Sequence, residues 1–446
     1  MSGATNMLRF ILNDEEIAIS EIRATETLLD YLRLTRRLRG SKEGCAEGDC
    51  GACTVLVGRL RGGELSYETV NACICFVGML HGTHVVTIEH LSPASGPLHP
   101  VQQAMVDFHG SQCGFCTPGI VMSLYGLWMQ TPRPSVPQMV ARLEALRDGR
   151  TVDIGEGRNR LIVPASVDDL AEIYAANPGG TLVSGATDVG LWVTKFMRDI
   201  GPMIYIGHLP ELQTITETEG ALTLGAGITY TQARVAVVKH FPQLAELWDR
   251  IGGGQVRNAG TVGANIANGS PIGDTPPPFI ALGAHITLRR GNERREVKLK
   301  DFFIAYGKQD RQPGEFVESV TIPYLPAGEK FACYKVSKRK DEDISALCGA
   351  FRIFVNDDGV VGMVRIAFGG MAATPKRAKA VEEALLGKPW PAATVEAALP
   401  AFAADFQPLT DMRASKEYRM LAAQNLLRRF QLETTGAAER LSRAVA

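Results

Sequence analysis

The sequence predicts a multidomain α+β protein, and three observations support this fold class. The 446 residues exceed what one hydrophobic core usually holds, so two to four domains are expected. A loop rich in cysteine and glycine, Lys42–Thr54, lies among short strand patterns near the amino terminus. Two glycine-rich stretches and an alternation of strand and helix patterns follow in the second half of the chain, which is typical of α+β architecture.

The composition is that of an ordinary globular protein, with 45% hydrophobic and 21% charged residues. The net charge of −1 gives no indication of a nucleic-acid or anionic-membrane partner. No apolar run reaches the length of a membrane span, and the first residues lack a secretory pattern. Most of the nine cysteines lie in the first 116 residues, so we expect metal ligands in the cytoplasm rather than disulfides.

The first 92 residues predict a compact domain of the β-grasp type. Residues 7–19 contain two apolar strand patterns around an Asn-Asp turn, which indicates a hairpin. Thr27–Leu34 has helical spacing and a threonine that can cap the helix. A strand pattern follows the cysteine-rich loop at 54–58, and Val85–Ile88 would be the closing strand.

The cysteine-rich loop reads KEGCAEGDCGACT and sets Cys45, Cys50 and Cys53 in the spacing C-x4-C-x2-C, with Cys73 following after a strand. This is the plant-type ferredoxin spacing for a [2Fe–2S] cluster. The interleaved glycines permit φ > 0 and let backbone N–H groups approach the sulfurs. A zinc site or scattered buried thiols are the alternatives. Zinc sites usually use paired C-x2-C units, so the spacing favours iron and sulfur.

Residues 93–148 predict a small helical domain. Two amphipathic helical stretches, His99–His109 and Pro118–Gln130, meet at the motif QCGFCTPG. Cys113 and Cys116 form a C-x2-C pair at this junction, a pattern compatible with zinc, a redox pair or a cluster. Residues 149–163 are dense in glycine and charge, and we expect them to be a linker.

The region 164–328 begins with a capped helical pattern and contains two glycine-rich stretches, TLVSGATDVGLWV and Gly252–Asp274. Neither is a G-x-G-x-x-G motif that enters a helix, so an ordinary Rossmann domain is excluded. Backbone N–H groups passing close to a pyrophosphate explain the small residues better. Glycine-rich turns of a sheet remain the alternative.

The last region, 329–446, alternates strand patterns with helical patterns at Thr374–Leu386 and Ser415–Leu432. This alternation predicts an antiparallel sheet with helices on one face. Cys333 and Cys348 fall in strand patterns and are expected to be core thiols.

Together these motifs resemble the small, iron–sulfur/FAD subunits of bacterial xanthine dehydrogenases, within the molybdenum hydroxylase family. The resemblance extends over nearly the whole chain. The stretches that carry it are KEGCAEGDCGACT, LHPVQQAMVDFHGSQCGFCTPG, SGATDVGLWVTK, GANIANGSPIGD, QPGEFVESVTIP, KDEDIS, RIAFGGMAATPKRA and DMRASKEYR. It implies a plant-type ferredoxin domain (1–92), a helical second-cluster domain (93–148), an FAD domain of the vanillyl-alcohol-oxidase type (164–328) and a C-terminal antiparallel α+β flavoprotein domain (329–446).

The resemblance also implies a function. Such a chain takes electrons from a molybdopterin subunit that oxidises hypoxanthine or xanthine to urate, passes them through [2Fe–2S] to FAD, and reduces NAD. FAD suits the last position because it accepts single electrons and delivers a hydride. A heterotetramer of two small and two large chains is implied. The equivalent subunit of an aldehyde-, nicotinate- or carbon-monoxide-oxidising enzyme, or a non-catalytic ferredoxin-like carrier, remains an alternative.

For the clusters, the resemblance assigns the first to Cys45, Cys50, Cys53 and Cys73, with Cys75 less suited as the fourth ligand. Cys113 and Cys116 match half of the second cluster. The other half, a C-x-C pair, is missing, because no cysteine lies between Cys116 and Cys333. An omitted segment is favoured over a lost cluster, because both helical stretches and QCGFC are retained.

For the flavin, the resemblance assigns contacts in two turns and at two later positions. Lys335 and Ile344 would lie near the isoalloxazine ring. Asp343 is a candidate catalytic residue, and with Tyr306 it would mark the side from which NAD approaches. Glu342 lies beside Asp343. The implied FAD contacts are Leu182, Val183, Ser184, Gly185, Ala186, Thr187, Asp188, Val189, Thr261, Gly263, Asn265, Asp274, Lys335 and Ile344.

Overall fold

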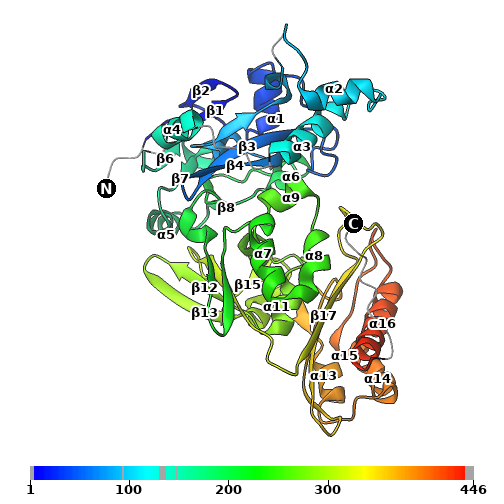
Figure 1. Cartoon of the computed structure of the whole chain (residues 1–446). Helices are drawn as coiled ribbons and strands as arrows, with labels where there is room; N and C mark the ends of the chain where they lie inside the picture. The colour runs from blue at the N-terminus through cyan, green and yellow to red at the C-terminus, as the bar shows by residue number, and fades with distance from the viewer. Residues whose placement is uncertain (1–4, 93–94, 130–136, 147, 437–446) are drawn as a thin grey trace.

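The computed structural model describes residues 5–92, 95–129, 137–146 and 148–436. The chain forms a multidomain α+β structure, as predicted. In Figure 1 the amino-terminal sheet and the helices α2 to α4 lie at one end, the green helices and strands of the central region occupy the middle, and the carboxy-terminal sheet with its helices lies at the other end. No helix in the described ranges is long and apolar enough to cross a membrane.

The amino-terminal part is a five-stranded sheet of order β2-β1-β5-β3-β4, which confirms the β-grasp prediction. The expected hairpin is present, since β1 and β2 pair antiparallel from Leu8↔Ile19 to Leu12↔Glu15. Thr27 caps the first helical segment by accepting a hydrogen bond from the Asp30 N–H. The elements are β1 (Leu8–Leu12), β2 (Glu15–Ile19), α1 (Leu28–Asp30), a π-helical turn (Tyr31–Thr35), β3 (Thr54–Arg61), β4 (Glu64–Asn71) and β5 (His84–Val86).

His84 on β5 is buried and uncharged in this sheet. Its Nε2–H donates to the Asn13 carbonyl at 2.7 Å, so Nδ1 accepts from the Tyr67 hydroxyl at 2.6 Å. Burial lowers the pKa of His84 to about 4, because a charged imidazolium would lose its hydration there.

The helical region contains α2 (Pro100–Asp107), α3 (Thr117–Met129) and α4 (Pro137–Leu146). Helix α3 packs directly on β3 and β4. Two glycines allow this close approach: a Cβ on Gly119 would lie 2.2 Å from the Gly51 carbonyl oxygen, and one on Gly126 would lie 2.6 Å from Thr69 Cγ2. The QCGFC motif therefore lies beside the cysteine-rich loop, with Phe115 close to Gly44.

Residues 149–163, for which a linker is expected, carry two strands instead. β6 (Val152–Ile154) and β7 (Leu161–Val163) belong to a four-stranded sheet of order β6-β7-β9-β8. In this sheet β7, β9 and β8 run parallel. The linker prediction is wrong for these strands because their apolar residues, all buried, pack into the core. The remaining elements here are β8 (Thr181–Val183), β9 (Met203–Tyr205), α5 (Val167–Ala176) and α6 (Val189–Thr194).

The rest of the central region is an antiparallel sheet of order β10-β11-β16-β12-β13 with several helices. The helices α7, α8, α10 and α11 follow β11 and share one hydrophobic core with the sheet, whereas the short helix α9 has no buried residue. The elements are β10 (Ile215–Glu217), β11 (Ala221–Gly225), α7 (Tyr230–His240), α8 (Ala245–Asp249), α9 (Gly254–Ala259), α10 (Val262–Asn268), α11 (Pro276–Leu282), β12 (His285–Arg290), β13 (Glu293–Lys298), α12 (Leu299–Phe302), β14 (Phe303–Ala305), β15 (Lys308–Gln309) and β16 (Phe316–Pro323).

The carboxy-terminal part is the predicted antiparallel sheet, of order β17-β18-β19-β20. Its own helices gather on one side in Figure 1, and the buried helix α11 contacts β18 and β19 as well. Cys333 and Cys348 are buried in β17 and β18, so the prediction of core thiols is confirmed. The elements are β17 (Lys330–Val336), β18 (Leu347–Val355), β19 (Val361–Gly369), β20 (Lys376–Arg377), α13 (Lys379–Leu385), α14 (Ala392–Ala398), α15 (Phe402–Asp405) and α16 (Lys416–Thr434).

Candidate functional site

A cavity of about 900 Å³ lies where the three parts of the chain meet. Its wall includes Glu47–Asp49 of the cysteine-rich loop, the turn after β8, the segment around α9 and α10, and the loop between β17 and β18. Cofactor sites typically measure roughly 300–1,000 Å³, so the cavity has a suitable size. Of the residues predicted to contact FAD, all except Val183 line this cavity; Val183 is fully buried in the core.

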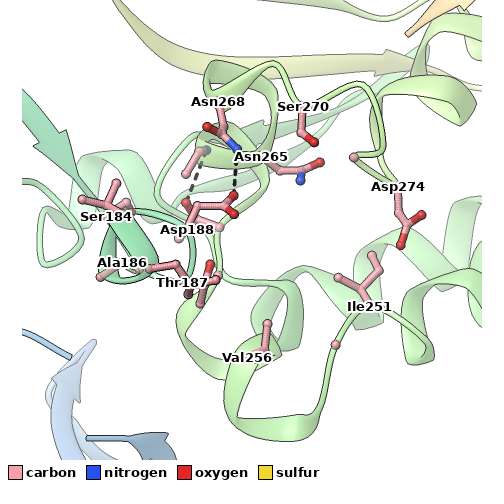
Figure 2. Close-up of a pocket in the computed structure, with 18 of the residues that line it drawn as sticks. Ser184, Ala186, Thr187, Asp188, Ile251, Val256, Asn265, Asn268, Ser270 and Asp274 are labelled. Atoms are coloured by element: carbon pink, nitrogen blue, oxygen red, sulfur yellow. Dashed lines mark hydrogen bonds between the residues drawn. The ribbon is translucent and has the colours of Figure 1, made fainter. Parts of the chain in front are cut away.

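The turn after β8 presents backbone donors to the cavity (Figure 2). The N–H groups of Gly185, Ala186 and Thr187 make no hydrogen bond to any described residue. Ala186 has φ 58°, so the turn bends through the left-handed region. A Cβ on Gly185 would lie 1.7 Å from the Ala259 carbonyl oxygen, which only glycine avoids. Successive free N–H groups in such a turn form an anion-binding concavity.

The hydroxyl of Ser184 is a further donor that lacks a partner in the described residues. Its Oγ is buried and makes no hydrogen bond to the described residues, although it lines the cavity. A buried hydroxyl without a partner costs free energy, so a bound polar group would stabilise it. Together with the free N–H groups of the turn, it fits the phosphate oxygens of a dinucleotide.

The second glycine-rich stretch forms the opposite wall of the cavity. Gly263 packs so closely that a Cβ there would lie 2.3 Å from Ala226 Cβ. Asn268 Nδ2 donates to Asp188 Oδ2 at 2.8 Å, the contact drawn in Figure 2. Burial raises the pKa of Asp188. The two glycine-rich stretches are therefore joined across the cavity by a side-chain hydrogen bond.

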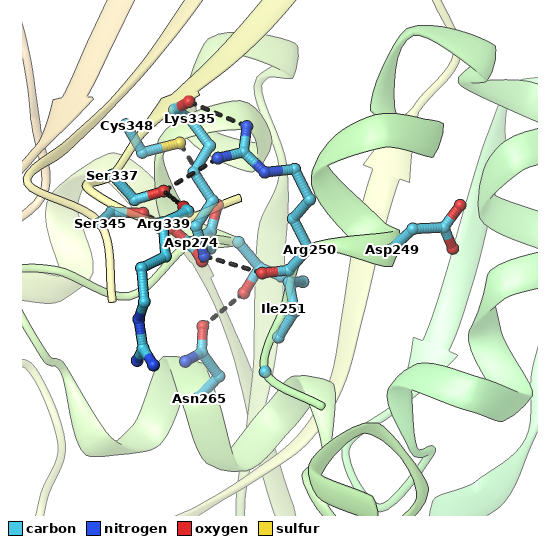
Figure 3. A network of polar contacts seen from close by, with 12 residues as sticks. Asp249, Arg250, Ile251, Asn265, Asp274, Lys335, Ser337, Arg339, Ser345 and Cys348 are labelled. Atoms are coloured by element: carbon cyan, nitrogen blue, oxygen red, sulfur yellow. Dashed lines mark hydrogen bonds and ion pairs between the residues drawn. The ribbon is translucent and has the colours of Figure 1, made fainter. Parts of the chain in front are cut away.

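A buried ion pair, drawn in Figure 3, forms part of the cavity wall. Lys335 Nζ lies 2.7 Å from Asp274 Oδ2 and donates to the Arg250 carbonyl at 2.8 Å. Ser345 Oγ donates to Asp274 Oδ1 at 2.5 Å. The Arg250 guanidinium in turn donates to the Lys335 carbonyl at 3.1 Å and to Ser337 Oγ at 2.9 Å. This network fixes the carboxy-terminal sheet against the central region.

The residues predicted on the NAD side lie apart in the structure. Asp343 lines the cavity, and its Oδ2 accepts a hydrogen bond from the Arg339 N–H at 2.8 Å, which lowers the pKa of the carboxyl. Glu342 also lines the cavity and lies over Gly253. Tyr306 is 76% exposed and does not line the cavity. The structure therefore brings Asp343, but not Tyr306, to the cavity.

The thiols of Cys45 and Cys50 in the cysteine-rich loop interact with each other, and the thiol of Cys53 interacts with that of Cys73, which follows β4. The N–H groups of Glu47 and Cys50 each donate to Cys45 Sγ at 3.4 Å. Burial raises the pKa of the Cys45 thiol, but these N–H donors lower it below its usual value overall. Backbone N–H groups directed at a sulfur are the arrangement that stabilises a thiolate ligand.

No group of three or more histidine, cysteine or acidic side chains in the described ranges could hold a single ion. A [2Fe–2S] cluster instead binds two ligands at each iron, so two thiol pairs fit it. Cys75 Sγ instead donates to the carbonyl of Phe76 at 3.8 Å, and burial raises the pKa of this thiol to about 11.

Three side chains that the sequence did not single out join the amino-terminal part to the elements around the cavity. Gln255 Nε2 on α9 donates to Thr54 Oγ1 at 3.3 Å and to Ser123 Oγ at 3.4 Å. Asn258 Nδ2, one turn further, donates to the Thr69 carbonyl at 3.0 Å. Thr194 Oγ1 donates to the Ala46 carbonyl at 2.8 Å. No local pattern marks these residues, since their partners are distant in the sequence.

Four family models match the chain in consecutive order. They are described as a 2Fe-2S iron-sulfur cluster binding domain (10–78), a [2Fe-2S] binding domain (87–150), an FAD binding domain in molybdopterin dehydrogenase (156–325) and a CO dehydrogenase flavoprotein C-terminal domain (332–434). The chain belongs to the molybdenum hydroxylase family, as an iron–sulfur/FAD subunit.

Curated relatives in the family include the xanthine dehydrogenase of Emericella nidulans, which is 28% identical over 497 residues. That match covers 90% of this chain and 36% of the relative. The xanthine dehydrogenase/oxidase of Rattus norvegicus is also 28% identical, over 86% of this chain and 36% of the relative. The chain therefore spans about a third of the length of the curated relatives it matches.

Among solved structures, the carbon monoxide dehydrogenase from Hydrogenophaga pseudoflava matches with 29% identity and a TM-score of 0.56, covering 60% of this chain and 93% of that chain. Quinoline 2-oxidoreductase from Pseudomonas putida 86 matches with 24% identity and a TM-score of 0.55, covering 62% of this chain and 97% of that chain. The second likeness shows the fold alone.

Within this family the residues of the first loop and of the cavity fit their implied cofactors. The free N–H groups and the unpartnered Ser184 hydroxyl fit FAD, and the paired thiols fit one [2Fe–2S] cluster. The second [2Fe-2S] binding domain fits less well. Cys113 and Cys116 are exposed, and residues 87–150 contain no other cysteine. They supply half the ligands that a [2Fe–2S] cluster needs.

Proposed function

We propose that the chain is the electron-transfer subunit of a xanthine dehydrogenase. It would receive electrons from a molybdopterin-containing chain that oxidises hypoxanthine or xanthine to urate, and would pass them on to NAD. The support for the substrate is that the curated relatives named above are xanthine dehydrogenases matching most of this chain. A heterotetramer with two molybdopterin chains belongs to the same proposal, as does a cytoplasmic location, in keeping with the free cysteines.

One observation carries the electron-transfer role: the cavity proposed for FAD is lined in part by the cysteine-rich loop, through Glu47, Gly48 and Asp49. When bound, a [2Fe–2S] cluster carries one electron and FAD converts single electrons into a hydride. Gly48 lies between Cys45 and Cys50, and its carbonyl accepts from Asn71 Nδ2 at 2.7 Å. The same short loop thus holds iron ligands and forms the cavity wall.

The chain's own residues would bind and orient the flavin. The free N–H groups of Gly185, Ala186 and Thr187 and the Ser184 hydroxyl would bind the pyrophosphate. Asp188 and Asp274, as acceptors, suit ribose or ring N–H donors rather than phosphate. Lys335 and Ile344 would lie beside the isoalloxazine ring. We also propose that Asp343 lies on the side from which NAD approaches, since it lines the open cavity wall.

The test is to purify the chain anaerobically together with its molybdopterin-containing partner and to measure NADH formation with xanthine. Benzaldehyde, nicotinate and carbon monoxide serve as competing reductants. Xanthine-dependent NADH formation supports the proposal. Reduction of a dye by another of these substrates, without reaction with xanthine, would assign the chain to a different enzyme of the family. The likeness to the Hydrogenophaga pseudoflava carbon monoxide dehydrogenase makes that second outcome a specific alternative.

A colourless preparation without flavin would contradict both the xanthine dehydrogenase proposal and its carbon monoxide dehydrogenase alternative. Absorption in the flavin and iron–sulfur bands is therefore recorded first, before any substrate is tried. NADH-dependent reduction of ferricyanide by the chain alone then tests the NAD side independently of the molybdopterin partner.

A further inference from the structure

The turn proposed to bind the flavin pyrophosphate contains no positively charged residue. Residues 184–189 include no lysine or arginine, and the second glycine-rich stretch, which is described throughout, places none on the cavity wall. Two carboxylates, those of Asp188 and Asp274, do line the cavity. A buried charge is favourable only when it is compensated, so a pyrophosphate at the turn requires a cation close to it.

The cations on the cavity wall come from other segments and already have partners. Three of them pair with carboxylates: Lys335 with Asp274, Arg339 with Asp343, and Arg413 with Asp411. The other two, Arg311 and Lys338, donate to backbone carbonyls of the protein. A further arginine, which does not line this cavity, faces the turn from the amino-terminal sheet.

A second, small cavity of about 30 Å³ adjoins the flavin cavity at the turn. Ser184, Gly185 and Thr261 line both cavities, so they form a partition between them. Arg59 and Arg61 of β3 line the small cavity, whereas no aspartate or glutamate among the described residues does. The volume suffices for a water molecule, which needs roughly 10–15 Å³. Two arginine side chains therefore lie behind the turn, across a narrow gap.

The alternation of side chains along β3 directs Arg59 to the turn. Val55, Val57 and Arg59 share one face of the strand, because every second residue of a strand points to the same side. Val55 and Val57 belong to the hydrophobic cluster that also contains Val183, directly before the turn, and Ala186 within it. Arg59 is the next residue on that face and is partly buried, so its side chain lies towards the turn.

The charge of Arg59 is not matched by a carboxylate of its own. Glu68 is the carboxylate that acts on it electrostatically, but Glu68 accepts two hydrogen bonds from Arg61, at 2.7 and 3.0 Å. Arg59 itself makes no ion pair with a residue of the described ranges, and its hydrogen-bond partner is the Tyr205 hydroxyl. Burial raises the pKa of Tyr205, so this hydroxyl stays neutral. A positive charge therefore remains uncompensated behind the turn.

We propose that Arg59 is the positive charge that holds the flavin pyrophosphate at the turn, acting through the partition from the iron–sulfur domain and not by direct contact. It is a positioning residue, since the partition lies between it and the flavin cavity. Solvent screens a buried charge less than a surface charge, so its attraction reaches across the partition. The proposal rests on the proposed function in taking the large cavity as the FAD site. It adds that FAD affinity depends on the amino-terminal domain.

The experiment measures the dissociation constant of FAD from the full chain, freed of bound flavin, by quenching of flavin fluorescence. Arg59→Met and Arg59→Gln remove the charge, and each should weaken FAD binding by about tenfold or more, roughly 1.4 kcal/mol. Arg59→Lys keeps the charge and should bind FAD almost as tightly as the wild type. Iron content and melting temperature, recorded for every variant, show whether the fold is intact; if Arg59→Met does not fold, Arg59→Gln decides.

The matched control is Arg61→Met/Glu68→Gln, which alters the same face of β3 and the same small cavity but leaves the net charge unchanged. Its FAD affinity should stay close to that of the wild type.

Two outcomes overturn the inference. FAD binding that is unchanged in both uncharged variants would show that Arg59 does not act on the flavin. A loss in Arg59→Lys or in the charge-neutral control as large as that in Arg59→Met would assign the effect to packing instead of charge. The proposed function is tested separately, because a wild-type chain that binds no FAD contradicts the flavin site itself, whereas tight FAD binding that is indifferent to Arg59 contradicts only this inference.

Discussion

The ion pair between Lys335 and Asp274 is expected to contribute strongly to stability, and Asp274→Asn tests this. Lys335 has 3% and Asp274 11% of its side chain exposed, and the charged atoms are 2.7 Å apart. Removing one partner of a buried pair leaves an uncompensated charge, at a cost of about 3–5 kcal/mol. Asparagine keeps the shape and one acceptor for Ser345, so we expect the lower end, about 3 kcal/mol.

The measurement is urea unfolding of the flavin-free chain followed by circular dichroism, on Asp274→Asn, Lys335→Met and the double variant. Residues in one network should couple by about 0.5–3 kcal/mol, so the double variant should lose less than the sum of the single losses. Glu396→Gln is the control, because its pair with Arg428 is exposed and worth about 0–1 kcal/mol. Strictly additive losses, or a loss at Asp274 no larger than at Glu396, would refute the reasoning.

Three further predictions concern single positions. Burial lowers the pKa of His84 to about 4, so between pH 6.5 and 4 the unfolded chain binds a proton that the folded chain does not. The free energy of unfolding should therefore fall by about 3 kcal/mol as the pH is lowered from 6.5 to 4. His84→Gln should flatten this pH dependence when unfolding is measured by urea titration. Gly119→Ala should press α3 away from the Gly51 carbonyl, lower stability by about 1–3 kcal/mol and reduce the iron content of the first loop, as thermal melting and iron analysis would show. Gly185→Ala should weaken flavin binding by about tenfold or more, roughly 1.4 kcal/mol, in equilibrium dialysis, whereas Gly179→Ala, where a Cβ meets open space, should not.

The sequence predicts those elements whose signal is local. The hairpin of β1 and β2 has apolar residues on either side of a polar turn, and β17 to β19 are strands of seven to nine mainly apolar residues. The strands β6 and β7 have three residues each, which is too short for a period to be recognised. β7 pairs with β9, which lies some forty residues later in the chain, so its strand conformation depends on a partner that the local sequence does not reveal.

The same limit applies to the site. The glycine-rich turn at 184–188 is recognisable as a motif, and so are the three cysteines of the first loop with Cys73 after them. Gln255 and Asn258 have no such signal, because their partners Thr54 and Thr69 lie about two hundred residues earlier in the chain. Lys335 and Asp274 are each predicted near the flavin, but their ion pair across 61 residues follows only from the packing of two sheets.

Helix α9 explains why loop and cavity must respond together. Val256 on this helix lines the cavity, while Gln255 and Asn258 hydrogen-bond to the amino-terminal part. The helix is short, so one face cannot move while the other stays in place. Gly185 packs against its last residue, and Gly119 packs against the loop whose Thr54 accepts from Gln255. Strain introduced at either glycine is therefore transmitted through α9, and Gly119→Ala should weaken flavin binding although it lies outside the cavity. Unchanged flavin affinity in that variant, despite loss of iron, would show that the two sites are independent.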